Sequence, residues 1–303
     1  MGIKIALAGN PNCGKTTMFN ALTGANQYVG NWPGVTVEKK EGKLKGKRKN
    51  DDIIVTDLPG IYSLSPYTLE EVVSRDYILN DDPDVIIDLV DATNIERNLY
   101  LTTQLIETGV PVVIALNMTD LLEKRGIKID TNRLSMLLDC PIVETSALKQ
   151  TGLDTLIETA IKVANKKEVD LPREIFSKEM EAAVADVKGV LPDTISEDKK
   201  RWYAVKFLEN DSKVVESMNL SAAAKAAVDK DRKELETKHD DDMESIVTDE
   251  RYKFIQKIVE TTVKKGKDKL TTSDKIDRIV TNRILGIPTV SYTHLTLPTT
   301  SRV

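Results

Sequence analysis

The sequence of 303 residues contains few of the residues that build disulfide frameworks or metal clusters. It has two cysteines, Cys13 and Cys140, and two histidines. This cysteine spacing fits neither a disulfide framework nor a metal motif, and it suits a reducing compartment. The chain also lacks a secretory leader and any run near the roughly 20 apolar residues that span a bilayer. We therefore expect the chain as given to be soluble and cytoplasmic.

An excess of positive charge is also absent. Lys and Arg number 43 against 48 Asp and Glu, which gives a net charge of −5. Residues 1–165 carry 17 basic against 22 acidic side chains, and residues 166–303 carry 26 of each. Neither half has the basic balance typical of a nucleic-acid-binding surface, so we expect no nucleic-acid partner.

The clearest motif that is present lies near the start of the chain. An apolar run from Ile3 to Ala8 leads into Gly9-Asn10-Pro11-Asn12-Cys13-Gly14-Lys15-Thr16-Thr17. The pattern Gly-x-x-x-x-Gly-Lys-Thr between a strand and a helix predicts a phosphate-binding loop. Its backbone N–H groups would hold phosphate oxygens, Lys15 would reach the β- and γ-phosphates, and the Thr16 hydroxyl would bind Mg²⁺. The alternative is a glycine-rich turn without a ligand.

Two further motifs fit the same nucleotide site. The strand-like run from Ile53 ends in Asp57-Leu58-Pro59-Gly60. Asp57 would help to hold Mg²⁺, and the Gly60 N–H would sense a γ-phosphate. Between this motif and the loop lies Gly34-Val35-Thr36, whose threonine hydroxyl would close over Mg²⁺. Each of these motifs alone is more typical of a turn or a strand end.

A fourth and a fifth motif predict recognition of guanine. Asn117-Met118-Thr119-Asp120 follows an apolar strand, and the Asp120 carboxylate would accept hydrogen bonds from guanine N1–H and its exocyclic amine. Adenine offers no donors there, and unpaired buried polar groups can reject an analogue by roughly 10⁴–10⁵. The alternative is an Asx turn that starts a helix. The segment Ser146-Ala147-Leu148 follows a short strand and would present a backbone N–H to guanine O6.

The order of these five motifs predicts the domain organisation. We expect an α/β fold, a P-loop GTPase domain with a mostly parallel central sheet, at residues 1–166. From about Asp170 the strand signals stop and apolar residues recur at helical spacing, which predicts a small all-α domain at residues 167–272. The acidic run His239 to Asp242 is expected to be a solvated break, the alternative being a set of iron ligands.

One segment is more specific than the general GTPase motifs. Val29-Gly30-Asn31-Trp32-Pro33-Gly34-Val35-Thr36-Val37-Glu38, together with the phosphate loop and Asp57 to Leu64, resembles the cytosolic G domain of FeoB, a family of bacterial ferrous-iron transporters with a TRAFAC-class GTPase domain. The likeness runs to about residue 288, with Cys13 in place of the usual Ser. The resemblance implies that residues 273–288 lead toward a membrane domain missing from this chain. Residues 289–303 are interpreted as foreign sequence, the alternative being a natural soluble tail.

The resemblance implies a GTPase that hydrolyses GTP to GDP and phosphate and regulates Fe(II) uptake. Ile61 stands where some GTPases carry a water-orienting Gln, so we expect slow intrinsic turnover. FeoB-like GTPases with Asn at the Asn12 position are stimulated by K⁺, which implies the Asn12 side chain and the backbone carbonyls of Gly30 and Trp32 as K⁺ ligands. Catalysis would then involve Asn12, Lys15, Thr36 and Gly60. The alternative for Asn12 is a side-chain hydrogen bond that stabilises the loop.

The resemblance also implies partners and a location. Besides guanine nucleotide with Mg²⁺, it implies the transporter's membrane domain and small cytosolic Feo accessory proteins, at the cytoplasmic face of the bacterial inner membrane. Whether the chain forms a homo-oligomer through the helical domain is left open by the sequence. The main alternative function is a GTPase of ribosome assembly or RNA modification, although the second half lacks a basic Gly-x-x-Gly clamp. A third possible function is a nucleotide-gated interaction switch, in which turnover of GTP is incidental.

Overall fold

The structure is a computed structural model that describes residues 2–24, 27–45, 52–65, 67–166, 173–218 and 220–265. The predicted lead-in at residues 273–288 and the tail at residues 289–303 lie outside this part of the chain. Among the described residues, no helix is both long and apolar enough to cross a lipid bilayer.

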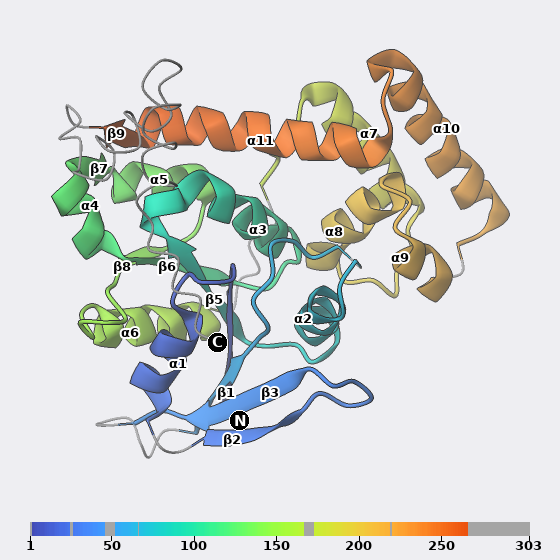
Figure 1. Ribbon diagram of the computed structural model, residues 1–303. Coiled ribbons are helices and arrows are strands. Elements are labelled where there is room, and N and C mark those ends of the chain that lie inside the picture. Colours follow the sequence, from blue (N-terminus) through green and yellow to red (C-terminus); the bar gives the residue numbers. More distant parts are fainter. Residues whose placement is uncertain are drawn as a thin grey trace, which may run out of the picture.

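A seven-stranded sheet forms the centre of the first unit (Figure 1). Its order is β2-β3-β4-β1-β5-β6-β8, with the strands β1 (Ile3–Gly9), β2 (Gln27–Asn31), β3 (Glu38–Lys43), β4 (Ile53–Asp57), β5 (Val85–Asp91), β6 (Val112–Asn117) and β8 (Ile142–Glu144). The five strands from β4 to β8 in this order run parallel, and β2 and β3 form an antiparallel hairpin at one edge. The predicted mostly parallel sheet is confirmed.

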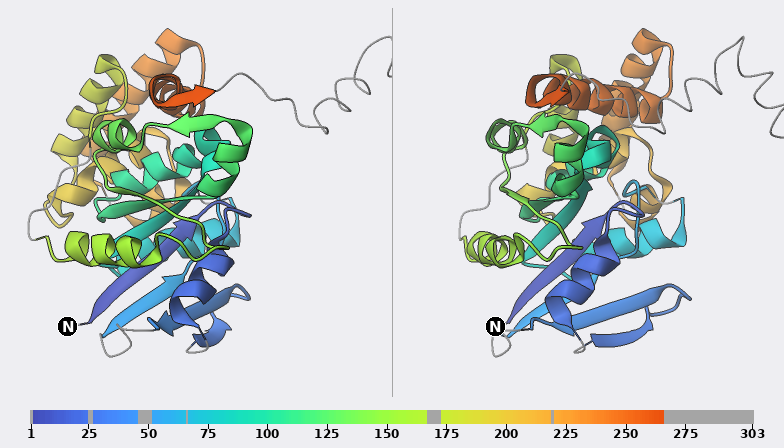
Figure 2. Two further views of the ribbon diagram at one scale, coloured as in Figure 1. Left: turned by 90° about the vertical axis from the view of Figure 1, so that its left-hand side faces the viewer. Right: turned by 60° about the vertical axis from the view of Figure 1, so that its left-hand side comes forward.

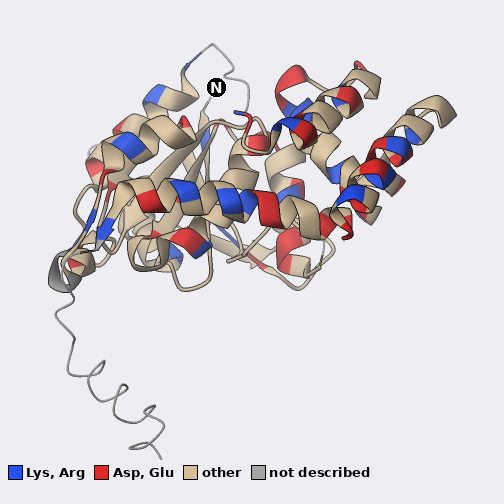
Figure 3. Ribbon diagram, turned by 90° about the horizontal axis from the view of Figure 1, so that it is seen from above, with Lys and Arg blue, Asp and Glu red and all other residues tan. Residues whose placement is uncertain are grey.

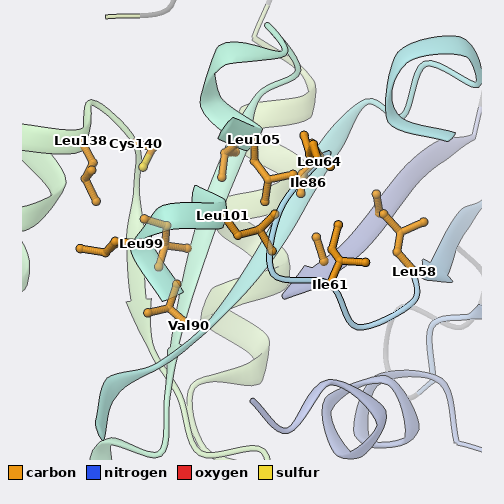
Figure 4. Close-up of a cluster of buried hydrophobic side chains, with 14 of the residues drawn as sticks. Leu58, Ile61, Leu64, Ile86, Val90, Leu99, Leu101, Leu105, Leu138 and Cys140 are labelled. Carbon is orange, nitrogen blue, oxygen red and sulfur yellow. The ribbon is translucent and has the colours of Figure 1, made fainter. Parts of the chain in front are cut away.

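Helices cover both faces of this sheet (Figure 2). One face packs against α1 (Lys15–Thr23) and α6 (Leu153–Ala164). The other packs against α2 (Leu69–Asn80), α3 (Ile95–Glu107), which follows the short 3₁₀ helix η2 (Ala92–Asn94), α4 (Thr119–Arg125) and α5 (Thr131–Leu138). Figure 4 shows the second core, in which side chains from α3 lie over those of β5. Because both faces are covered, the central strands are continuous apolar runs.

The second unit is helical, which confirms the predicted all-α region. It contains α7 (Lys178–Val190), α8 (Glu197–Leu208), α9 (Ser212–Ser217), α10 (Ala222–His239) and the start of α11 (Met243–Thr262). Their buried side chains form a separate core around Trp202, which is 1% exposed. The expected break between helices is present, because α10 ends at His239 and the Asp242 side chain caps α11.

Helix α11 belongs to both units. Met243, Ile246 and Val247 lie in the helical core, whereas Ile255 and Ile258 lie in the core between α3 and the sheet. After α11, β9 (Val263–Lys265) pairs antiparallel with β7 (Ile127–Ile129). The sequence pattern predicts no strand in this region, because three residues are too few to show an alternation of apolar and polar side chains. The boundary at residues 166 and 167 stays a prediction.

Buried ion pairs join the two units. Glu107 of α3 pairs with Arg251 of α11, and both side chains are at most 2% exposed. Arg75 of α2 pairs with Asp211 at 3.0 Å, with side chains 5% and 3% exposed. Removing one partner of such a pair leaves an uncompensated buried charge, so these contacts fix the position of the helical unit against α2 and α3.

A different buried carboxyl, Asp88 of β5, has no cationic partner among the described residues. It is 1% exposed and accepts a hydrogen bond of 2.6 Å from the Thr102 hydroxyl. Burial raises the pKa of Asp88 to about 7, although the bond from Thr102 opposes the rise. The folded state therefore holds a proton on this residue that the unfolded state releases at lower pH.

We expect Asp88→Asn to flatten the pH dependence of stability. The pKa of Asp88 is higher in the folded state than in the unfolded state. Its protonated form therefore contributes fully to the free energy of unfolding below pH 3.8, and this contribution is lost as the pH rises through about 7. The variant cannot ionise, so at pH 8 its free energy of unfolding should exceed that of the wild type by up to about 4 kcal/mol. Urea unfolding from pH 5 to 8 measures this, with exposed Asp76→Asn as the control. A constant difference between Asp88→Asn and wild type across this range would contradict the prediction.

Candidate functional site

The predicted phosphate loop connects β1 to α1. Its Gly14 has φ +95°, and a Cβ there would lie 2.6 Å from the Asn117 side-chain nitrogen, so the position requires glycine. Helix α1 begins without a side-chain cap and without an acidic residue in its first turn. By contrast, α2 begins with a capping box of Thr68 and Glu71. The first N–H groups of α1 are thus left for an anion, as a phosphate site requires.

The other residues of the loop divide into buried and exposed ones. Asn12 is exposed and has φ +68°, a left-handed conformation that Asn tolerates better than most residues. Thr16 and Thr17 are also exposed. Cys13 is 1% exposed, and burial raises the pKa of its thiol to about 12. The thiol is therefore neutral at physiological pH, which favours a packing role over a redox role.

The loop after β4 lies against the phosphate loop. Lys15 forms an ion pair of 2.9 Å with Asp57, whose side chain is 7% exposed. Burial raises the pKa of Asp57, and the charge of Lys15 opposes that rise. A Cβ on Gly60 would lie 3.2 Å from Pro11 Cα, and the Ile61 N–H donates to the Gly9 carbonyl at 3.3 Å. The structure thus brings the first two predicted motifs together.

Asn117 joins the phosphate loop to the segment predicted to face guanine O6. Its side-chain amide donates to the Cys13 carbonyl at 2.8 Å, and its side-chain oxygen accepts from the Ala147 N–H at 3.0 Å. Asn117 is 2% exposed, so both bonds are sheltered from water. One side chain therefore fixes the distance between the loop predicted to bind the phosphates and the loop predicted to face guanine.

Asp120, the predicted guanine reader, lies at the open edge of this arrangement. Lys149 pairs with its carboxylate at 3.2 Å, and that contact, with help from Ser146, lowers the pKa of Asp120. The carboxylate is thus ionised at neutral pH. Leu148, which precedes Lys149 in the chain, is 84% exposed, and Met118 has φ +63°. Lys149 is not among the predicted site residues, and its available signal is a basic residue directly after the Ser146-Ala147-Leu148 motif.

The remaining predicted residues are not brought to the phosphate loop. Thr36, Gly34 and Val35 lie in the turn of the β2–β3 hairpin, which extends from the sheet edge (Figure 1). Within the described ranges, the Thr36 side chain makes no hydrogen bond with residues 9–17. Trp32 is buried at the start of the hairpin turn, with its ring 5.3 Å from that of Tyr77, and Gly30 pairs with Lys39 inside the hairpin. Their roles as Mg²⁺ and K⁺ ligands stay predictions.

The donor set is compatible with a Mg²⁺ that arrives with a nucleotide. No cluster of three or more His, Cys, Asp or Glu side chains suited to a metal occurs in the described part of the chain. Thr16 and Asp57 offer two oxygen donors near Lys15. Mg²⁺ commonly takes one or two protein ligands together with substrate phosphates, so this small set fits the cation.

Family models match both units of the chain. The model described as "Ferrous iron transport protein B" matches residues 3–160, and that of the "FeoB cytosolic helical domain" matches residues 176–264. The chain belongs to the FeoB family. This membership argues against the alternative of a ribosome-assembly or RNA-modification GTPase.

The curated relatives are longer proteins. The "Fe(2+) transporter FeoB" of Escherichia coli strain K12 is 38% identical over 293 residues, and that of Methanocaldococcus jannaschii is 42% identical over 289 residues. These matches cover 94% and 93% of this chain but 37% and 42% of the relatives. The "Fe(2+) transport protein A/Fe(2+) transporter FeoB fusion protein" of Porphyromonas gingivalis is 41% identical over 300 residues, which covers 94% of this chain and 35% of that protein. The chain thus spans well under half the length of these relatives.

Solved FeoB structures share the fold. A GDP-bound variant of the S. thermophilus FeoB G-domain is 47% identical, with a TM-score of 0.82 over 86% of this chain and 100% of its own. An mGMPPNP-bound S. thermophilus NFeoB is 48% identical, with a TM-score of 0.76 over 88% of this chain and 99% of its own. The first unit of this chain therefore has the P-loop GTPase fold.

We expect Asn117→Ala to destabilise the nucleotide-free protein. The change leaves the Cys13 carbonyl and the Ala147 N–H without their buried partner, and each such loss costs about 1–3 kcal/mol. Urea unfolding should show a loss of about 2–4 kcal/mol. Asn80→Ala at the exposed end of α2 is the matched control. Equal midpoints for the two variants would show that the two loops hold their positions without Asn117.

Proposed function

We propose that this chain is the GTP-binding and GTP-hydrolysing cytoplasmic part of a ferrous-iron transporter, where it regulates Fe(II) uptake. The observation that carries the proposal is the Asn117 side chain, which joins the predicted phosphate loop at Cys13 to the predicted guanine-facing loop at Ala147. The FeoB relatives are named Fe(2+) transporters, and the solved neighbours hold GDP or GMPPNP. A nucleotide-gated switch without turnover is the alternative.

The residues at the site have distinct roles in this proposal. Lys15 neutralises charge on the β- and γ-phosphates, while the open N-terminus of α1 donates N–H groups to phosphate oxygens. Thr16 and Asp57 hold Mg²⁺, which supplies further positive charge at the phosphates when bound. Gly60 directs its N–H toward the γ-phosphate. Ile61 has no group that can orient water, so intrinsic turnover is slow.

Thr36 and the K⁺ ligands require a different position of the β2–β3 hairpin. In the structure, Thr36 is exposed in the hairpin turn, and Trp32, at the start of the same turn, is buried. We propose that Thr36 reaches Mg²⁺ and that Asn12, with the carbonyls of Gly30 and Trp32, holds K⁺ when this hairpin moves. A cation between the phosphates would offset charge that develops in the transition state.

The proposed location is the cytoplasmic face of the inner membrane. The family's membrane domain is the proposed partner, reached through residues 273–288. The fusion of a transport protein A with FeoB in one relative supports small Feo proteins as further partners. Self-association through the helical unit stays a proposal that a sedimentation measurement can test.

The first experiment tests base selectivity. Asp120→Asn should weaken GTP binding and improve xanthosine triphosphate binding, because the amide donates where the carboxylate accepted. A competition titration with both nucleotides measures the change. Asp154→Asn, an exposed residue on α6, is the control and should keep the wild-type preference. An unchanged preference for GTP in Asp120→Asn would remove Asp120 from base recognition.

The second experiment tests the cation. Replacing Na⁺ by K⁺ at constant ionic strength should raise the hydrolysis rate at least about tenfold, because the effect acts on the transition state and bulk screening is unchanged. Asn12→Ala should remove the difference between the salts. Thr36→Ala should lower the rate in both, since its proposed role is to order Mg²⁺.

Two outcomes would change this assignment. A wild-type rate indifferent to K⁺ would refute the K⁺ mechanism and leave GTP binding standing. K⁺ stimulation that persists in Asn12→Ala would move the K⁺ ligand to the carbonyls of Gly30 and Trp32 alone.

A further inference from the structure

The β7–β9 ribbon has one anchored face and one outward face. Ile127, Ile129 and Val263 are partly buried and pack against the core under α3 and α5. Between them, Lys128 and Lys264 stand directly opposite each other in the antiparallel register, and both are exposed. Side chains alternate across a strand, so the two lysines project from the face opposite the anchored one.

This pair of lysines works against the stability of the ribbon. Directly opposite residues have Cβ atoms about 4.5–5.5 Å apart, and like charges there are destabilising. Neither lysine has an ion pair within the described ranges, and the same holds for exposed Lys257 near the end of α11. One turn earlier, Lys253 pairs with Asp249 at 2.7 Å. The end of α11 and the ribbon thus carry three lysines that no acidic side chain of the described residues neutralises in an ion pair.

Two carboxylates lie close in sequence to these lysines. Asp130 accepts the Arg133 N–H at 3.0 Å and caps α5. Glu260 is exposed on α11, three residues after Lys257 and four before Lys264. Among these five described side chains, three lysines stand against two carboxylates, an excess of one positive charge. Figure 3, which looks down on α11, shows basic segments on the ribbon beside the end of this helix.

We propose that the outward face of the ribbon, with Lys128 and Lys264, docks on an anionic lipid surface. The inference rests on the proposed function, in which the chain continues from β9 toward a membrane domain. β9 is the last described element, so the ribbon is the described part nearest in sequence to that domain. Anionic headgroups attract lysines near a membrane surface, and they supply the counter-charge that the lysine pair lacks.

Vesicle flotation of the 303-residue chain tests the surface. The wild type should bind phosphatidylcholine vesicles that contain one quarter phosphatidylglycerol, and should not bind pure phosphatidylcholine. Lys128→Gln with Lys264→Gln should lower the partition coefficient about thirtyfold, since each lysine near an anionic surface contributes about fivefold. Added salt should weaken wild-type binding, because it screens the attraction.

The matched control is Lys213→Gln with Lys225→Gln, which removes the same charge from exposed positions on α9 and α10. This variant should bind the anionic vesicles as the wild type does. Equal loss in both double variants would show that net charge and not this face drives binding. Undiminished binding of the Lys128 and Lys264 variant, or no wild-type binding to anionic vesicles, would also overturn the proposal.

A GDP titration of the same samples keeps the two proposals apart. Both double variants should bind GDP as the wild type does, because the substituted residues lie outside the nucleotide site, and this also verifies folding. A wild type that binds vesicles but no guanine nucleotide would contradict the proposed function and leave the lipid surface standing.

Discussion

The geometry of the proposed nucleotide site depends on one buried amide. Asn117 bonds to a carbonyl of the loop after β1 and to an N–H of the loop after β8, although it lies 104 residues from Cys13 in sequence. Both loops follow parallel strands at the same edge of the sheet, and neither has another side-chain link of this kind to the other among the described residues. The close packing of Gly14 on the Asn117 nitrogen leaves no room for a larger residue. The glycine and the amide therefore act as a single structural unit.

A second constraint fixes the helical unit to the same sheet. Helix α11 contributes side chains to two cores, and Arg251 at its middle pairs with Glu107 of α3 in a buried position. On α2, Arg75 pairs with Asp211 of the helical unit. Helix α2 follows directly after the loop that carries Asp57 and Gly60. A change at that loop is therefore followed in the chain by a helix that a buried ion pair holds against the helical unit, and such a pair is costly to separate.

The sequence predicted those parts of the structure that depend on local pattern. The phosphate loop, the Asp57 motif and the parallel sheet follow from short motifs at strand ends and from apolar runs. The strand β9 could not be predicted, because its pairing with β7 is set by packing across 134 positions of chain, from Ile129 to Val263. The pairing of Lys149 with Asp120 was missed for a similar reason, since it depends on how a turn directs one side chain. Helical spacing identified Ile255 and Ile258 but not the core that they join.

The β2–β3 hairpin shows where two demands on one segment conflict. Its Trp32 is buried against Tyr77, with Lys39 4.8 Å above the ring, so packing holds the hairpin at the sheet edge. The proposed roles of Thr36 and of the Gly30 and Trp32 carbonyls require this segment at the phosphates instead. Moving it there exposes an aromatic side chain whose burial is worth about 1.5–3 kcal/mol. Contacts of Thr36 and the carbonyls with Mg²⁺, K⁺ and the γ-phosphate must offset that cost. The hairpin therefore favours the edge position until such ligands are present.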